Sequence, residues 1–165
     1  MHNDEYYMEI ALDLARQSAG EGEVPVGAVA VWEDGEIIGT GRNRRELGKN
    51  ALAHGEIEAI NNACQYKKGW RLHKCTLYVT LEPCPMCAGA IVNARIKRVV
   101  YGAFDEKAGA FGTVFNMNDL PLNHKPEIEK GFMECECKSQ LTEFFKKLRA
   151  EKKAEKDFFV KITKK

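Results

Sequence analysis

Hydrophobic positions in the first part of the chain switch from helical to extended spacing, and the switch predicts a helix followed by a hairpin. Apolar side chains recur at helical spacing after Asp4, which can cap the helix, and the pattern ends at Gly20. The next apolar run, residues 24–32, is continuous and typical of a strand buried on both faces. Asp34-Gly35 is a hairpin-turn signal, so residues 36–41 are expected to return as the partner strand.

Beyond the hairpin the pattern alternates between the two periodicities. The predicted order is helix 53–66, strand 74–81, helix 84–94, strand 98–102, strand 127–133 and helix 139–156. Residues 103–125 are rich in Gly, Pro, Asn and Asp, and are expected to form a long structured loop. This order predicts an α/β fold, a three-layer α/β/α sandwich around one mixed, mostly five-stranded sheet.

The length and composition fit one domain of an ordinary water-soluble protein. The chain has 165 residues, 44% hydrophobic and 30% charged. We expect residues 1–156 to form the domain and residues 157–165 a C-terminal tail that adds an edge strand, contacts a second copy or is disordered. No apolar run approaches the roughly 18 residues of a membrane span, and the amino terminus lacks an export signal. The six cysteines are therefore expected to be reduced thiols in the cytoplasm.

Charge is balanced over the chain but not along it. The net charge is +1, whereas residues 138–165 hold ten basic and four acidic side chains. This basic segment could contact phosphate groups, although a Lys-rich terminal helix is more often simply a solvated face.

Two short motifs carry the candidate chemistry. His54-Gly55-Glu56 precedes Pro83-Cys84-Pro85-Met86-Cys87, and H-x-E followed by P-C-x-x-C is the signature of zinc-dependent nucleobase deaminases. One imidazole and two thiolates make three ligands, which leaves one zinc coordination position for water and so favours a catalytic over a structural metal. Glu56 is then the group that moves protons between water and the leaving amine.

The spacing of these motifs predicts where they lie in the fold. Pro83 ends a strand and Pro85 suits the first position of a helix, so Cys84 and Cys87 should occupy the first turn of that helix. Residues two apart do not share the side of a helix, so His54 and Glu56 are expected at the start of the preceding helix. Two helix amino termini would then converge on one metal site.

The sequence resembles the bacterial tRNA-specific adenosine deaminases, members of the cytidine deaminase superfamily, from Tyr6 to about Arg149. The resemblance is carried by residues 24–29, 80–91 and 98–103. It implies a cytidine deaminase-like fold, a homodimer, and hydrolytic conversion of adenosine-34 to inosine in a tRNA anticodon loop. It also implies a role for each matching residue. His54, Cys84 and Cys87 would bind one zinc ion, and Glu56 would shuttle protons. Residues implied to contact the anticodon loop are Asn43 at the flipped adenosine, Asp105, Lys107, Asn123, Phe145 and Arg149.

The sequence departs from the family pattern at several positions. Gly55 stands where relatives usually have alanine, and because this position is expected to lie against the substrate, the smaller residue is expected to enlarge the pocket. Phe104 and Leu148 stand where relatives can carry arginine.

Two other functions are compatible with the motifs. One is deamination of a free nucleobase or nucleoside, such as guanine or cytosine. The other is a non-catalytic, zinc-stabilised RNA-binding module. The basic terminal helix together with Asp105, Lys107 and Asn123 favours RNA over a small substrate, and Glu56 argues against a purely structural metal.

Overall fold

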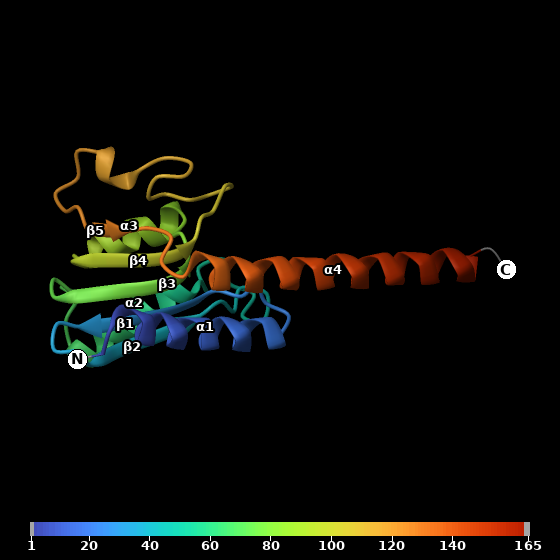
Figure 1. Cartoon of the computed structure of the whole chain (residues 1–165), viewed down its shortest axis with the longest axis horizontal. Helices are drawn as coiled ribbons and strands as arrows, with labels where there is room; N and C mark the ends of the chain where they lie inside the picture. The colour runs from blue at the N-terminus through green and yellow to red at the C-terminus, as the bar shows by residue number, and fades with distance from the viewer. Residues whose placement is uncertain (1, 164–165) are drawn as a thin grey trace.

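The computed structural model describes residues 2–163, which form a five-stranded sheet between two layers of helices (Figure 1). The strands are β1 (Gly27–Trp32), β2 (Ile37–Arg42), β3 (Cys75–Leu81), β4 (Arg98–Ala103) and β5 (Glu127–Glu129). Their order in the sheet is β2-β1-β3-β4-β5. β1 is antiparallel to β2 and β3, whereas β3, β4 and β5 run parallel. The expected α/β architecture around a mixed five-stranded sheet is confirmed.

Each face of the sheet has its own apolar core. The helices are α1 (Asp4–Gly20), α2 (Gly55–Lys67), α3 (Pro85–Asn93) and α4 (Glu134–Thr163). Ala28 and Ala30 of β1 pack with the cluster that includes α2 and α3, whereas Val29 and Val31 pack with the cluster that includes α1 and α4. Both faces of β1 are buried, as its continuous apolar sequence predicts.

The amino terminus is tied to the sheet by Asp4. Asn3, not Asp4, caps α1, because its side-chain Oδ1 accepts a hydrogen bond from the Tyr6 N–H at 3.1 Å. Asp4 instead accepts hydrogen bonds from both Nη atoms of Arg98, at 3.0 and 2.6 Å, and from the Tyr78 hydroxyl at 2.5 Å. The bond from Arg98, followed by that from Tyr78, lowers the pKa of Asp4. The prediction of Asp4 as the cap is wrong because this longer-range ion pair uses its carboxylate.

The start of α2 lies close against the sheet. A Cβ at Gly41 in β2 would lie 2.1 Å from the Gly55 carbonyl oxygen, so only glycine permits this approach. This contact brings the first turn of α2 to the sheet edge at which β1 begins and β3 ends.

The last third of the chain differs most from the predicted elements. β5 is only three residues long, and residues 104–126 contain a single short 3₁₀ helix, η1 (Met117–Asp119). α4 begins five residues earlier than expected and continues without a break through Lys156 to Thr163. The described part of the expected tail is therefore helical rather than an edge strand, and residues 164–165 lie outside the described part. None of the described helices combines the length and the apolar composition of a membrane span.

Candidate active site

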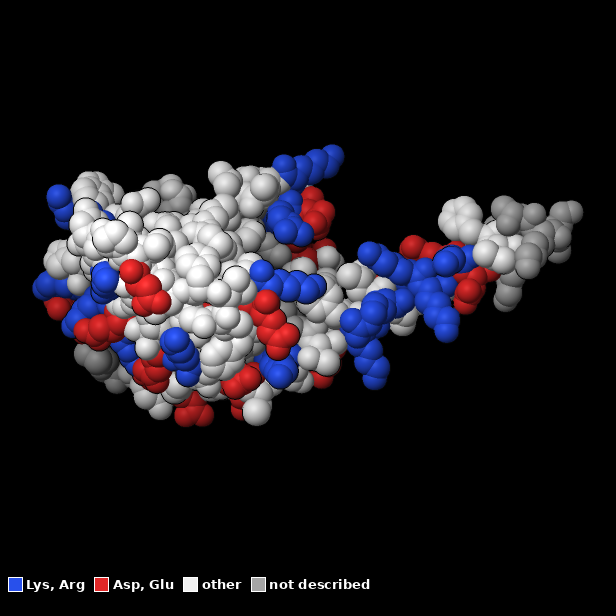
Figure 2. Space-filling model, turned by 90° about the horizontal axis from the view of Figure 1, so that it is seen from above, with Lys and Arg blue, Asp and Glu red and all other residues white. Residues whose placement is uncertain are grey.

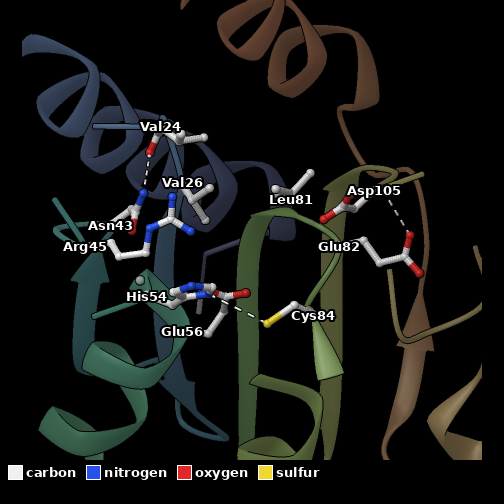
Figure 3. A pocket seen from close by; sticks show the side chains of 11 residues that line it. Val24, Val26, Asn43, Arg45, His54, Glu56, Leu81, Glu82, Cys84 and Asp105 are labelled. Carbon is white, nitrogen blue, oxygen red and sulfur yellow. Dashed lines mark hydrogen bonds between the residues drawn. The ribbon is translucent and has the colours of Figure 1, made fainter. Parts of the chain in front are cut away.

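A pocket opens at the sheet edge where β3 ends and β1 begins (Figure 3). Its volume is about 120 Å³. It is lined by Val24, Val26, Asn43, Arg45, His54, Gly55, Glu56, Leu81, Glu82, Cys84 and Asp105. These residues come from the ends of strands, the starts of two helices and two loops, so the pocket lies outside the sheet edge, as the motif positions predict.

The three predicted metal ligands converge on one point. His54 is the N-cap of α2, Cys84 is the N-cap of α3, and Pro85 follows at the first helical position. The His54 Nδ1 atom lies 3.7 Å from the Cys84 Sγ atom and 3.6 Å from the Cys87 Sγ atom. All three ligand atoms lie within 4.8 Å of one another. Zinc bonds of ordinary length at a tetrahedral angle separate a nitrogen and a sulfur ligand by about 3.6 Å, so this spacing fits a metal ion.

The cluster supplies three ligands rather than four. Among the described side chains, no further His, Cys, Asp or Glu completes the group of His54, Cys84 and Cys87. A structural zinc site is normally closed by four protein ligands, whereas a catalytic site keeps one position for water. The donor set therefore has the composition of an open metal site.

Hydrogen bonding within the cluster favours a charged sulfur. The bond from the Cys87 thiol, together with that from His54, lowers the pKa of Cys84 to about 4. The same interaction with Cys84, together with burial, raises the pKa of Cys87. Hydrogen bonding to Cys84 raises the pKa of His54. These interactions favour the thiolate form at Cys84 and the thiol form at Cys87.

Glu56 faces this cluster from the first turn of α2 (Figure 3). It is only 3% exposed, and its Oε2 atom has no hydrogen-bond partner among the described residues. Burial raises its pKa to about 7. A carboxyl group in this environment can take up and release a proton near neutral pH.

Asn43 lies on the opposite wall of the pocket and presents a free acceptor. Its side-chain Nδ2 donates to the Val24 carbonyl at 3.2 Å, and its backbone carbonyl accepts from the Ser18 hydroxyl at 2.8 Å. The Oδ1 atom is buried and has no partner among the described residues. A buried amide oxygen without a partner is costly, which suits a group that bonds to a substrate.

Gly55 packs against the sheet. A Cβ at this position would lie 3.2 Å from the Val26 carbonyl oxygen, 3.2 Å from the Arg42 Cα atom and 3.4 Å from the Gly41 carbonyl oxygen. The space that an alanine methyl group would fill is therefore bounded by strand backbone. A Cβ would fit there only tightly, and the effect of glycine on the size of the pocket and on the choice of base stays a prediction.

The remaining residues implied by the resemblance are spread around the pocket. Asp105 lines it, and its Oδ1 atom accepts hydrogen bonds from the backbone N–H groups of Lys107 at 3.0 Å and Ala108 at 3.2 Å. Lys107, Asn123 and Arg149 are exposed and do not line the pocket.

Phe145 is also outside the pocket. It is 39% exposed, and its ring meets that of the partly buried Phe144 edge-on at a centroid distance of 5.4 Å. Of the two adjacent aromatic residues, Phe145 is therefore the one with an available face.

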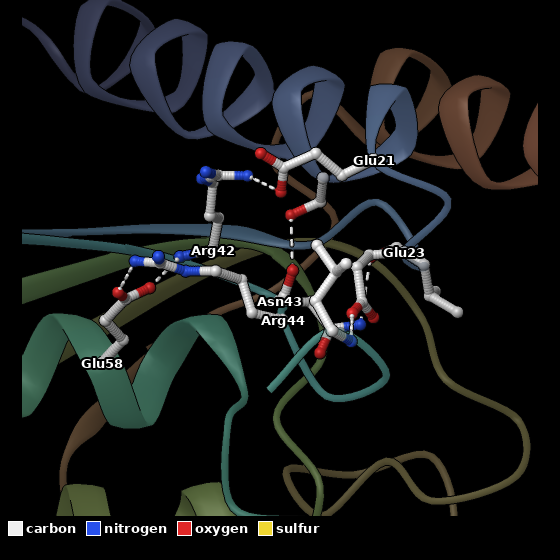
Figure 4. Close-up of polar contacts among 9 residues, drawn as sticks. Glu21, Glu23, Arg42, Asn43, Arg44 and Glu58 are labelled. Atoms are coloured by element: carbon white, nitrogen blue, oxygen red, sulfur yellow. Dashed lines mark hydrogen bonds and ion pairs between the residues drawn. The ribbon is translucent and has the colours of Figure 1, made fainter. Parts of the chain in front are cut away.

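Two buried glutamates that the motifs do not reveal hold the loops around the pocket. Glu82 is 1% exposed and accepts hydrogen bonds from the backbone N–H groups of Asp105 at 3.2 Å, Phe111 at 3.1 Å and Thr113 at 3.2 Å. Glu23 is also 1% exposed and accepts from the Leu47 N–H at 2.7 Å (Figure 4). For Glu82 the signal in the sequence is an acidic residue just before a proline at a buried strand end, which indicates a carboxylate that serves backbone donors, whereas Glu23 carries no such signal.

The loop that carries Asn43 is fastened on its other side by ion pairs (Figure 4). Arg42 pairs with Glu21, and Arg44 pairs with Glu58 of α2. The second Glu58 oxygen accepts from the Arg42 N–H at 2.9 Å. Arg45 pairs with Glu46 at 3.2 Å and also lines the pocket (Figure 3).

Comparison with known proteins places the chain in a family. A family model described as MafB19-like deaminase matches residues 2–149. A tRNA-specific adenosine deaminase of Bacillus subtilis is 48% identical over 155 residues, which cover 93% of this chain and 96% of the relative. The chain belongs to the tRNA-specific adenosine deaminase family. Its relative in Haemophilus influenzae is 47% identical over 154 residues, covering 93% of this chain and 89% of the relative.

Solved structures of deaminases have the same fold. A structure described as a tRNA:A34 deaminase matches with a TM-score of 0.78 and 41% identity, covering 83% of this chain and 99% of that chain. A guanine deaminase from Nitrosomonas europaea matches with a TM-score of 0.74 and 25% identity, covering 87% of this chain and 85% of that chain. The fold is therefore shared by structures described as a tRNA deaminase and as a guanine deaminase.

Proposed function

We propose that this deaminase converts adenosine to inosine at the wobble position, residue 34, of a tRNA anticodon loop. The observation that carries the proposal is the three-ligand cluster of His54, Cys84 and Cys87 beside the buried carboxylate of Glu56, whose Oε2 atom has no hydrogen-bond partner among the described residues. The reaction consumes one water, replaces the C6 amino group with a carbonyl oxygen and releases ammonia. This water must be activated and its protons must be moved, which are the two tasks that the site provides.

We assign zinc to the three-ligand cluster. One nitrogen and two sulfur donors at separations of 3.6 and 3.7 Å suit zinc better than magnesium or calcium, which take oxygen ligands. Zinc held there lowers the pKa of water and so supplies the nucleophile. The amino termini of α2 and α3 both point at the site, and their partial positive charge favours the thiolate forms of Cys84 and Cys87.

We assign proton transfer to Glu56. With its pKa raised to about 7, its carboxylate can take a proton from water and then hold it as a neutral acid. The same group then delivers this proton to the purine ring nitrogen, takes a second proton from the hydroxyl group added at C6 as the carbonyl forms, and passes it to the departing amine. Its burial keeps bulk water from competing for the proton.

The remaining pocket residues orient the base. Val24, Val26 and Leu81 give apolar surfaces against which a flipped purine can lie. The free Oδ1 atom of Asn43 accepts a hydrogen bond from the nucleoside. A base from a single-stranded loop reaches such a pocket without breaking base pairs.

The surface around the pocket holds the rest of the loop. The exposed face of Phe145 stacks on a base, while Lys107 and Arg149 contact phosphate groups and Asn123 makes a polar contact to the loop. These assignments come from the resemblance, and the exposure of the four side chains supports them.

Deamination of a free purine is the second candidate function, because the guanine deaminase structure matches with a TM-score of 0.74. Incubation with an anticodon stem-loop and, separately, with free guanine, cytosine and adenosine distinguishes the two. Digestion of the RNA and mass spectrometry should detect inosine at the wobble position. Turnover of the free compounds alone would exclude the tRNA function.

We also propose that residues 1–156 act as a single catalytic domain in a cytoplasmic homodimer. The resemblance supports the dimer, and the reduced thiols of the metal cluster suit a reducing compartment. Light scattering of the purified protein measures the mass: twice 18.6 kDa is expected, and a monomer over the active concentration range would exclude the dimer.

A further inference from the structure

The second half of α4 extends past the body of the protein (Figure 1). The helix starts over the end of β4, where the Cys137 side chain packs on Gly102, and it passes α1, where Gln140 donates to the Leu12 carbonyl. The helix then borders a groove that is lined in part by Gly20, Pro25, Phe144 and Lys147. The segment that contains Pro25 also forms one wall of the pocket, so α4 lies beside that wall. From residue 149 to residue 160 every side chain is exposed.

Charges on this projecting part are segregated by helical spacing. Lys152, Lys153 and Lys156 follow Phe145 by seven, eight and eleven residues, and Arg149 follows it by four, so all five lie on one face. We call this set the basic face.

Two of the three acidic residues of the projecting part lie elsewhere on the helix, whereas Asp157 follows Lys153 by four residues and lies at the edge of the basic face. Glu151 and Glu155 follow Leu148 by three and seven residues, and so continue the face that packs on the body. Seen from above, Lys and Arg side chains gather on the projecting helix, with Asp and Glu side chains beside them (Figure 2).

The projecting part continues past the end of the family model at residue 149. The tRNA:A34 deaminase structure covers 83% of this chain, whereas the Bacillus subtilis relative matches over 93% of it. Lys152, Lys153 and Lys156 continue the face that carries Phe145 and Arg149.

We propose that the basic face binds the phosphate backbone of the RNA duplex stem that adjoins the anticodon loop. The proposal rests on the proposed function, because it takes Phe145 as the contact to the loop. With a rise of about 1.5 Å per residue, Lys152 and Lys156 lie roughly 10 and 16 Å further along the helix than Phe145, away from the body. A stem that leaves the loop on this side presents phosphates along that length. Lysine ammonium groups bind them as point charges, which gives affinity without reading the sequence.

Binding of RNA to the basic face explains why Glu151 and Glu155 lie on another face of the helix. Acidic residues on the basic face would repel phosphate, whereas Glu151 and Glu155 on another face do not. A helix that served only as a solvated surface has no need to separate the two signs.

The test compares two sets of variants of the full chain. Lys152→Gln, Lys153→Gln and Lys156→Gln are combined in one variant, and Glu151→Gln with Glu155→Gln forms the matched control on the same helical segment. Both receive a hairpin with the anticodon stem and a single-stranded oligonucleotide with the loop sequence alone. Zinc content and helicity measured by circular dichroism check that each variant is intact.

The lysine variant should raise KM for the hairpin about tenfold and leave kcat unchanged, because it loses uniform binding. The slope of log affinity against log salt should fall by about 2 to 3, close to one per lysine. Neither KM nor the salt slope should change for the single-stranded oligonucleotide. The acidic control should bind the hairpin as tightly as the unmodified protein does, or more tightly.

Three results would overturn the proposal: an unchanged KM and salt slope on the hairpin, an equal loss on the single-stranded oligonucleotide, or an equal loss in the acidic control. A change of oligomeric mass in the lysine variant with no change in RNA binding would assign the face to a second copy instead. If the unmodified protein fails to deaminate the hairpin, the proposed function fails, and this result is separate from the comparison of binding affinities.

Discussion

The floor of the pocket, which is the metal cluster with Glu56, and its rim, which is the set of exposed side chains around the opening, are built in opposite ways. On the floor, His54, Glu56, Cys84 and Cys87 lie in or next to the first turns of two helices, and Glu56 and Cys87 are almost fully buried. On the rim, which surrounds the pocket without lining it, the exposed side chains proposed to contact RNA come from distant parts of the sequence: Lys107, Asn123, Phe145 and Arg149. This difference shows that short spacings in the sequence fix the positions of the reactive groups. Recognition of a large substrate depends instead on how a long loop and a long helix lie beside those groups.

Buried carboxylates link the two regions. Glu82 holds the loop that carries Asp105 and Lys107, and Glu23 holds the loop that follows Asn43. The rim is therefore anchored by groups that are as buried as the floor.

Removal of a metal ligand should cause the largest loss. Cys84→Ala leaves two ligands, so zinc content and deamination should both fall to background. The control is Cys135→Ala, because Cys135 is exposed and is not part of the metal cluster. Metal analysis and an inosine assay measure both variants, and retention of stoichiometric zinc in Cys84→Ala would remove this residue from the ligand set.

Removal of the proton-transfer group should leave the metal in place. Glu56→Ala is expected to lower kcat by at least about 10² to 10⁴, the usual contribution of general acid–base catalysis, with zinc content and RNA affinity nearly unchanged. Single-turnover kinetics with the hairpin measure the rate. Loss of zinc in this variant, or activity near that of the unmodified protein, would contradict the assigned role.

A change on the rim should affect binding rather than chemistry. Phe145→Ala should raise KM by about tenfold, since stacking on one base contributes about 1–3 kcal/mol, and should leave kcat and zinc content unchanged. Phe145→Tyr keeps the ring and serves as the control. An equal fall in kcat would place Phe145 in the chemistry of the floor and remove the distinction drawn here.

The link between the regions should give the smallest effect on activity. Glu82→Gln replaces one acceptor oxygen with an amide donor that faces backbone N–H groups, so the free energy of unfolding should fall by about 1–3 kcal/mol. Cleavage within residues 104–126 by a protease should speed up, and KM for the hairpin should rise a few-fold with zinc content unchanged. Glu23→Gln should have a weaker effect, because Glu23 holds a single backbone donor. Equal resistance of Glu82→Gln and the unmodified protein would show that this carboxylate does not hold the loop.

The sequence predicts the floor better than the rim for a physical reason. Pro83, Pro85 and the two-residue spacing of His54 and Glu56 restrict the local backbone, so the helix starts could be placed from spacing alone. The expected order of helices and strands is also confirmed, although the last strand, β5, has only three residues.

The parts that could not be predicted depend on contacts between distant segments. The roles of Glu82 and Glu23 depend on backbone donors at least 23 residues away in the sequence. The sequence predicts Asp4 rather than Asn3 as the cap of α1, because the pairing of Asp4 with the distant Arg98 cannot be inferred from the neighbouring residues. The sequence predicts that α4 ends at about Lys156, but the helix continues to Thr163. No glycine or proline marks a stop in this segment, so the sequence does not show where the helix ends.

Metal removal and reconstitution test the central claim most directly. Zinc stripped from the purified protein with a chelator should abolish inosine formation in the hairpin, and one zinc ion per chain should restore it, whereas magnesium should not. Full deamination of the hairpin by protein that contains no metal would contradict the account.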